Sequence, residues 1–239
     1  MKDLKIVFKR ALMDTSESIR KNGIVFTVIL SILFFMIDKF GGLFYGGLLS
    51  IITYFIQMLL LALVAKLANN MVIANRVPIN DIFYNIQPYF FNVTNTYFVL
   101  YVVELVFNML TMIFMPRSNL ASATNFALIS IAIMFIVDNI LLSSIFEAVY
   151  LESLGGLAAF RRAFQFLKEN FVIWMIISLP YILLKTLDYR FLGAIFQVPV
   201  WADILKALIM PTILVFRGKA YLILSQSTKR KREFMNEYY

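Results

Sequence analysis

Six long apolar stretches constrain the fold of this chain more than any other feature of its sequence. They cover residues 23–38, 42–66, 90–115, 122–147, 171–187 and 200–222. A helix needs about 20 apolar residues to cross a bilayer, and the hydrocarbon core admits only helices and closed barrels. The sequence therefore predicts an all-α polytopic membrane helix bundle with about six spans, of which the first and fifth are short. Pro180 and Pro211 predict kinks in the last two spans.

The composition supports the same class of protein. Hydrophobic residues make up 61% of the 239 residues and charged residues 15%, whereas roughly 25% of a soluble domain is charged. No polar stretch is long enough for a second domain, so we expect one integral membrane domain over 1–239. The segment before the first apolar stretch contains Asp3, Asp14 and Glu17, which argues against a signal peptide.

The chain contains neither Cys nor His. Their absence excludes thiol nucleophiles, disulfides, imidazole bases and most zinc or copper sites. We therefore expect no metal and no other cofactor. The sequence also lacks a Walker loop, a Rossmann glycine pattern and a serine elbow.

The distribution of basic residues predicts the orientation in the membrane. With a cytoplasmic N-terminus, only five of the 22 Lys and Arg residues fall on the outer side, namely Lys39, Arg117, Lys185, Arg190 and Lys206. Basic residues concentrate on the cytoplasmic side of membrane proteins. We therefore expect both termini in the cytoplasm and a location in the cell membrane. Topology also explains the formal charge of +8, so we expect no nucleic-acid partner.

A short repeat divides the chain into three units. Phe8-Lys-Arg-Ala-Leu12 is similar to Phe160-Arg-Arg-Ala-Phe164, and an Asn precedes the apolar stretch that follows each of them; residues 78–86 are a weaker counterpart. Apolar residues recur at helical spacing in the two stronger copies, which predicts amphipathic helices at the membrane surface. Each unit, over 1–70, 78–151 and 155–225, is predicted to be an amphipathic helix followed by a two-span hairpin.

This plan, with Ala159-Phe-Arg-Arg-Ala-Phe-Gln-Phe-Leu-Lys-Glu-Asn170 before a span, resembles the bacterial six-span membrane proteins related to the membrane domain of glycerophosphoryl diester phosphodiesterase. The resemblance concerns the architecture of most of the chain. The soluble phosphodiesterase domain has no counterpart here, so the resemblance implies no catalytic residue.

Acidic residues within the predicted spans are candidates for a functional site. Glu104 lies near the middle of the third span with Asn108 one turn later, and Asp138 lies in the fourth. Buried carboxylates that lie close together cannot both ionise cheaply. The set Glu104, Asn108 and Asp138 therefore predicts an intramembrane proton, cation or substrate site, or protonated acids that only join helices. Glu147 is interpreted as an interfacial residue.

Two other groups of residues have predicted structural roles. Basic residues beside the spans are expected to contact lipid headgroups of the anionic inner leaflet; these are Lys9, Arg10, Arg161, Arg162, Lys229, Arg230, Lys231 and Arg232. The small residues Gly42, Gly46 and Ser50 follow one another at four-residue spacing, which predicts close helix packing.

Three functions remain open. The first is a transporter or permease component for a small molecule or lipid. The second is a non-transporting organiser or accessory subunit with a membrane-protein partner. The third is a membrane-embedded enzyme that modifies lipids.

Overall fold

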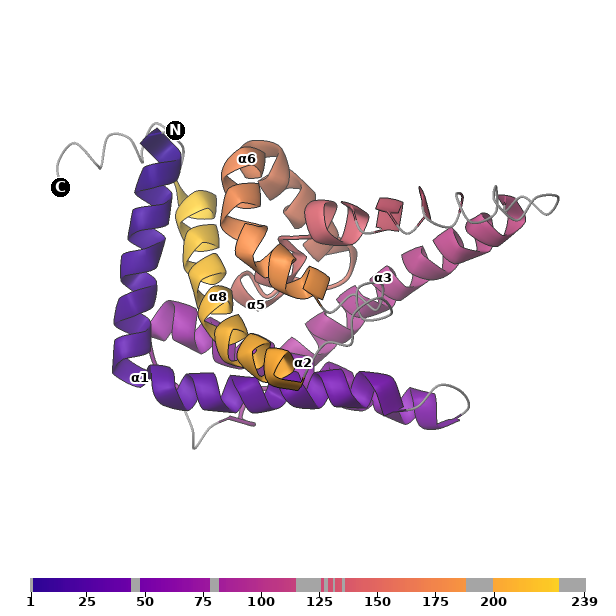
Figure 1. Cartoon of the computed structure of the whole chain (residues 1–239), viewed down its shortest axis with the longest axis horizontal. Coiled ribbons are helices and arrows are strands. Elements are labelled where there is room, and N and C mark those ends of the chain that lie inside the picture. Colours follow the sequence, from indigo (N-terminus) through magenta and orange to yellow (C-terminus); the bar gives the residue numbers. More distant parts are fainter. Residues whose placement is uncertain are drawn as a thin grey trace.

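The computed structural model describes residues 2–43, 48–77, 82–114, 126, 129–130, 132–134, 136–187 and 200–227. Every regular element in these residues is helical, which confirms the all-α prediction (Figure 1). The elements are α1 (Lys2–Leu43), α2 (Leu48–Ala74), α3 (Gln87–Phe114), the π-helical turn η2 (Val137–Leu141), α5 (Ile145–Leu151), α6 (Leu157–Leu187) and α8 (Val200–Gln226).

Four described helices contain a segment long and apolar enough to cross a membrane: Ile51–Ala74, Gln87–Phe114, Leu157–Leu184 and Ile204–Gln226. The two halves of α1 supply a fifth if they count as one broken span. These helices indicate a membrane-embedded protein, but six spans are not confirmed. The predicted fourth span, 122–147, lies partly outside the described residues and ends in η2 and the start of α5.

Two helices bend between a first half that the sequence predicts to be amphipathic, called the amphipathic half below, and an apolar half. The axis of α1 turns by 94° between Asp3–Lys21 and Gly23–Ile37 (Figure 1). A Cβ on Gly23 would lie 2.4 Å from Cγ2 of Ile19, so the bend requires glycine. The backbone of α6 leaves helical geometry at Asn170, with φ −127° and ψ 15°. Both bends occur at the point where the predicted repeat places an Asn before an apolar stretch.

The segment before α3 differs from the two stronger copies of the repeat. Residues 82–86 form turns rather than a helix, and 78–81 lie outside the described residues. Lys66 of α2 is 6% exposed, and its ammonium donates to the backbone carbonyls of Ile82, at 2.9 Å, and Tyr84. The arrangement of three amphipathic-helix-plus-hairpin units is therefore not confirmed.

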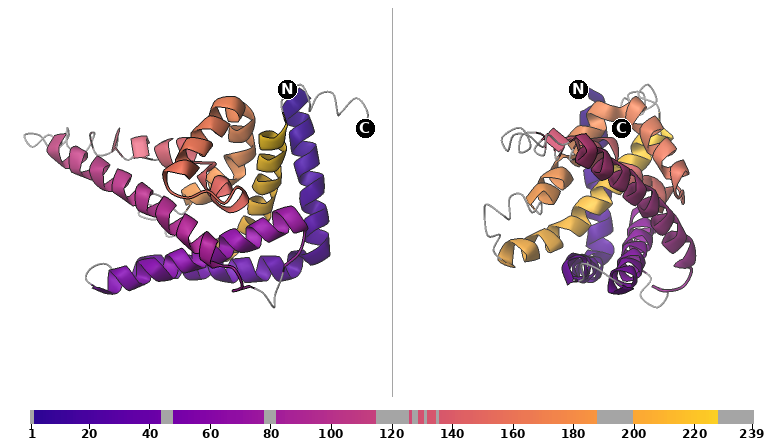
Figure 2. Two further views of the ribbon diagram at one scale, coloured as in Figure 1. Left: turned by 180° about the vertical axis from the view of Figure 1, so that it is seen from behind. Right: turned by 90° about the vertical axis from the view of Figure 1, so that its right-hand side faces the viewer.

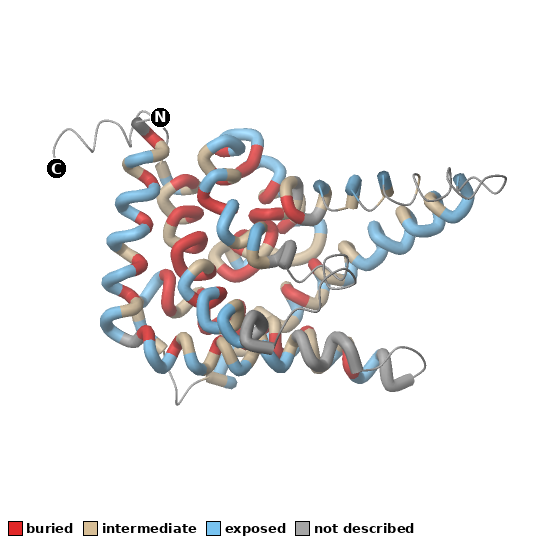
Figure 3. Tube along the Cα trace, in the orientation of Figure 1, coloured by how far each residue is buried: buried red, intermediate tan, exposed pale blue. Residues whose placement is uncertain are grey.

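The amphipathic half of α1 packs against protein as well as facing outward. Val7 and Ala11 are buried in a cluster with aromatic residues of α6 and α8, whereas Phe8 and Leu12 are 44% and 53% exposed. The cluster is built on Phe166, Trp174 and Tyr221, whose rings have centroids 4.4–6.0 Å apart. Buried residues accordingly follow one face of this half in Figure 3. Only the outer part of its apolar stripe is available to lipid.

A close helix contact is present at Gly218 of α8. A Cβ there would lie 2.5 Å from the hydroxyl oxygen of Tyr150 and 2.6 Å from Cγ2 of Val72, so glycine allows α8 to approach α2 and α5. The contact predicted for Gly42, Gly46 and Ser50 is not tested, because Gly46 and the burial of the other two lie outside the description. Towards its C-terminal end, α3 diverges from the other helices (Figure 2).

Candidate functional site

A buried ion pair joins α5 to α8. Glu147 and Arg217 are 0% and 2% exposed. The Nη2 atom of Arg217 lies 3.0 Å from Oε1 and 3.1 Å from Oε2 of Glu147, and it also donates to the backbone carbonyl of Ser143. Glu147, interpreted from the sequence as an interfacial residue, is thus buried within the protein, and its depth in the membrane stays a prediction. Packing of the short helix α5 against α6 and α8 carries this carboxylate into the core.

Aromatic rings enclose the guanidinium of Arg217. Its Cζ lies 4.1 Å from the ring centroid of Tyr181 and 5.1 Å from that of Trp174, both on α6. Trp174 Nε1 donates to Ser143 Oγ at 3.0 Å, and this hydroxyl donates to the carbonyl of Ile140 in η2 at 2.9 Å. The π-helical turn, α5, α6 and α8 thus hold one charged group together.

Such a pair contributes little net stability. Moving each ion out of water costs several kcal/mol, and replacement of a buried pair by packed apolar side chains is often neutral or stabilising. The pair therefore needs an explanation other than stability, such as specificity of packing or recognition of a ligand.

A cavity lies directly beside the pair. Its volume is about 470 Å³, within the range of about 300–1,000 Å³ typical of small-molecule sites. Arg217 is part of its wall, whereas Glu147 is not among the lining residues. Much of the wall is apolar, but it includes the polar side chains of Tyr54, Gln57, Thr96, Tyr97, Tyr101, Glu104, Ser143 and Tyr181.

The predicted acidic site is only partly described. Glu104 of α3 lines the cavity, and Asn108, one turn later, is exposed and is not among the described lining residues. Asp138 lies in η2, but its side chain is outside the description. A shared site of Glu104, Asn108 and Asp138 therefore stays a prediction.

Residues that sequence reasoning missed surround Arg217. In the sequence, Arg217 is one of the basic residues on the predicted cytoplasmic side, and no pattern distinguishes the tyrosines of the cavity. The signal available in the sequence was a pair of opposite charges, Glu147 and Arg217, near the same predicted end of the fourth and sixth spans. Spans that end on the same side can bring such charges together, but the same pattern also fits two interfacial residues.

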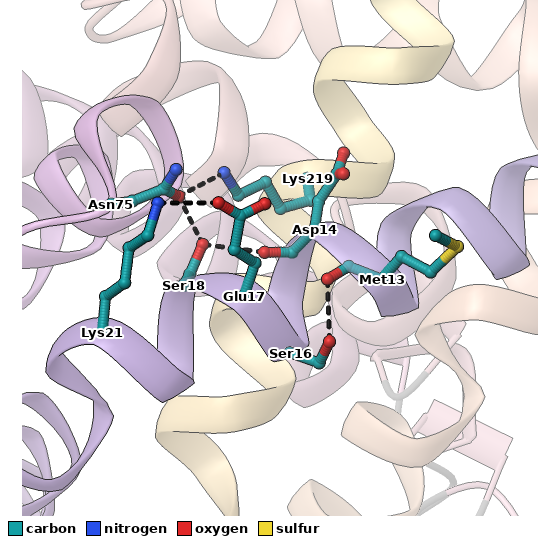
Figure 4. Close-up of polar contacts among 8 residues, drawn as sticks. All are labelled: Met13, Asp14, Ser16, Glu17, Ser18, Lys21, Asn75 and Lys219. Carbon is teal, nitrogen blue, oxygen red and sulfur yellow. Dashed lines mark hydrogen bonds and ion pairs between the residues drawn. The ribbon is translucent and has the colours of Figure 1, made fainter.

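A second polar cluster ties the amphipathic half of α1 to α2 and α8 (Figure 4). Asn75 follows α2 with φ 53°, a conformation that commonly ends helices. Its Oδ1 accepts hydrogen bonds from Lys219 Nζ, at 2.8 Å, and from Ser18 Oγ. Nearby, Lys21 Nζ lies 2.7 Å from Oε1 of Glu17 and holds the pKa of that carboxyl below its usual value. This cluster holds the amphipathic half in place.

The predicted lipid-contact residues have different surroundings. Lys9, Arg10 and Arg161 are exposed. Arg162 Nε lies 2.6 Å from Oε2 of Glu152, whose other oxygen accepts from the Tyr221 hydroxyl at 2.8 Å. Arg162 is thus paired within the protein. The basic residues Lys229, Arg230, Lys231 and Arg232 lie outside the described residues.

The residues that the structure describes include no group of three or more acidic side chains able to hold a metal ion. No family model, no curated protein and no solved structure matches the chain. The resemblance to the phosphodiesterase-related membrane proteins therefore stays an expectation. The apolar helices indicate an α-helical, membrane-embedded protein. The cavity and the charged side chain in its wall are the features of the described residues that bear on function.

Proposed function

We propose that this chain is a membrane carrier that binds a small organic molecule or a lipid in the cavity beside Arg217. The observation that supports the proposal is a cavity of about 470 Å³ whose wall is rich in tyrosine and includes the charged side chain of Arg217. Polar groups in a membrane interior are costly and usually face substrate or ion pathways. A scaffold that only packs helices has no need of such a space.

The cavity wall comes from helices that interrupt or bend, which suits a carrier. Ile37 lies at the end of α1's apolar half, and Tyr181 lies in the apolar half of α6 beyond Asn170. Discontinuous helices beside a central site are a common feature of transporters. In the proposed carrier, movement of these halves relative to α2 and α3 opens the cavity to either side of the membrane.

The test compares a blocked cavity with an unblocked one. Leu100→Trp places the largest side chain in the wall, and Val103→Trp, on the same helix but exposed and outside the lining, is the matched control. Native mass spectrometry of the protein purified in mild detergent identifies the bound molecule, and its radiolabelled form is then used in proteoliposome counterflow. We expect binding and flux in the wild type and in Val103→Trp, and neither in Leu100→Trp. Equal flux in both variants would disprove transport through this cavity, and no flux in the wild type would disprove the carrier function.

We further propose a topology for this carrier. Six spans, both termini in the cytoplasm of the cell and amphipathic halves of α1 and α6 on the inner leaflet are consistent with the basic-residue distribution and with the two bends. Cysteine accessibility tests this proposal on a chain that has no native Cys. Cysteines introduced at Lys9 and Arg161 should both react only with reagents that reach the cytoplasm.

A second candidate function, an accessory subunit, is supported by α3. Its C-terminal half extends from the bundle and exposes large apolar side chains, among them Tyr101, Met112, Ile113 and Phe114 (Figure 2). A partner helix could cover this surface, as lipid could. A single species of monomer mass after purification from native membranes in mild detergent would count against this alternative.

A further inference from the structure

Glu147 engages only part of the Arg217 guanidinium. Both carboxylate oxygens lie against one nitrogen, Nη2, which also donates to Ser143. The Nε atom is buried and has no hydrogen-bond partner among the described residues. A guanidinium binds carboxylates and phosphates most strongly through two parallel N–H bonds. Glu147 contacts only Nη2, so the Nε–H group of Arg217 remains as a donor for a second anion.

The free donor belongs to a residue of the cavity wall. Arg217 lines the cavity, and Glu147 is not among the lining residues. Tyr54 also lines the cavity, and within the described part of the chain its buried hydroxyl has no hydrogen-bond partner. Buried donors left unpaired are costly. An acceptor group that reached both would therefore be bound strongly.

The geometry points to an organic-anion site in which a carboxylate or phosphate group of the ligand accepts hydrogen bonds from Arg217 Nε and the Tyr54 hydroxyl. This inference rests on the proposed carrier function, because the ligand occupies the same cavity. Glu147 holds the guanidinium in place when the cavity is empty. The anionic group of the ligand and Glu147 then lie beside the same guanidinium and repel each other.

The remaining wall restricts the rest of the ligand. Glu104 also lines the wall, and an ionised carboxylate there would repel a second anionic group on the ligand. The rings of Tyr97, Tyr101 and Tyr181 offer apolar and aromatic surface instead. The site therefore suits a molecule with one anionic group on an apolar or aromatic body rather than an anion charged at both ends.

Trp174 provides a direct assay, because its ring lies 5.1 Å from the guanidinium. The chain has two Trp residues, so Trp201→Phe leaves Trp174 as the reporter in the full-length protein. The fluorescence titration uses three probes of the same shape in neutral detergent: 4-phenylbutyrate, 4-phenylbutyramide and 4-phenylbutylamine. We expect the carboxylate to bind roughly ten-fold or more tightly than the amide and the amine.

Two further probes distinguish the sources of the anion. Phenylbutyl phosphate compares a phosphate with the carboxylate at the same site. Dihexanoyl phosphatidate is added as a competitor: displacement of 4-phenylbutyrate assigns the site to a lipid headgroup, and failure to displace it assigns the site to a free organic anion.

Substitutions separate recognition from a structural role. Glu147→Gln removes the repelling carboxylate and should tighten binding of 4-phenylbutyrate about ten-fold, whereas a pair that only supports the fold would give weaker binding. Adding Arg217→Met to Glu147→Gln should abolish binding. Tyr54→Phe should weaken binding about three- to ten-fold, and Tyr84→Phe, on an exposed turn, is its control. If the Glu147 variant does not fold, the Tyr54 variant still tests the site.

Three results would overturn the anion site: equal affinity for the amide and the carboxylate, weaker carboxylate binding in Glu147→Gln, or no binding of any probe. The carrier proposal is judged separately. If the carboxylate and the amide bind equally well, and Leu100→Trp abolishes binding of both, the cavity is a ligand site without selectivity for anions. Absence of both a co-purified ligand and flux in the wild-type protein would instead remove the carrier function.

Discussion

The ion pair of Glu147 and Arg217 predicts a strongly non-additive pattern of stability. Removing one partner of a buried pair typically costs about 3–5 kcal/mol. Glu147→Gln leaves the guanidinium buried, but Tyr181 and Trp174 lie within 4.1 and 5.1 Å of it, and cation–π contacts of about 2 kcal/mol limit the loss to about 2–3 kcal/mol. Arg217→Met leaves a buried carboxylate that can take up a proton, so we expect a loss of about 3 kcal/mol.

The double variant Glu147→Gln/Arg217→Met should lose only about 1 kcal/mol, because it leaves no buried charge. The loss in the double variant is therefore smaller than the sum of the two single losses by about 4–5 kcal/mol. Reversible unfolding by dodecyl sulfate in mixed micelles, followed by circular dichroism, measures each free energy of unfolding. Glu17→Gln, which removes an exposed pair, should cause no measurable loss. Additive losses in the double variant would show that the two residues do not act as a pair.

Three further predictions test the helix geometry. Gly23→Ala should destabilise the protein by about 1–3 kcal/mol in the same unfolding assay, and Ile19→Ala should restore part of the loss; an undisturbed Gly23→Ala would show that the bend does not need glycine. Gly218→Ala should lower the free energy of unfolding by a similar amount, and Val72→Ala should restore part of that loss. No restoration by Val72→Ala would count against a close contact between these two residues. Lys66→Met should make the turn before α3 sensitive to limited proteolysis, and unchanged protection would contradict its role.

The helices could be predicted from the sequence because each one depends on local composition. The apolar stretches 42–66, 90–115, 171–187 and 200–222 overlap the four described segments that are able to cross a membrane. Their ends shift by as much as a few turns, since a helix continues beyond its apolar stretch where its next residues pack on protein. The interruption of α6 lies at Asn170, where the predicted repeat ends, whereas the sequence predicted a kink only at Pro180 in this helix.

The charged site could not be predicted, because its formation depends on tertiary packing. A carboxylate near the end of an apolar stretch, such as Glu147, has the same sequence pattern whether it faces lipid headgroups or the core. Which environment it meets depends on the turn after η2, which directs α5 back towards α6 and α8. For the same reason Arg162, predicted to contact lipid, instead pairs with Glu152. The sequence therefore shows where charged residues lie relative to the predicted spans, but it does not show which of them form ion pairs.

The two bent helices link the predicted repeat to the cavity. In α1 and in α6 the amphipathic half is anchored by small buried residues, Ala11 in the first and Ala159 and Ala163 in the second. The apolar half beyond each bend reaches the cavity wall, at Ile37 and at Tyr181. Because each amphipathic half continues directly into a wall helix, its docking on the bundle helps to determine where that part of the wall lies. In the proposed carrier, the predicted repeat would therefore act through the position of the cavity wall.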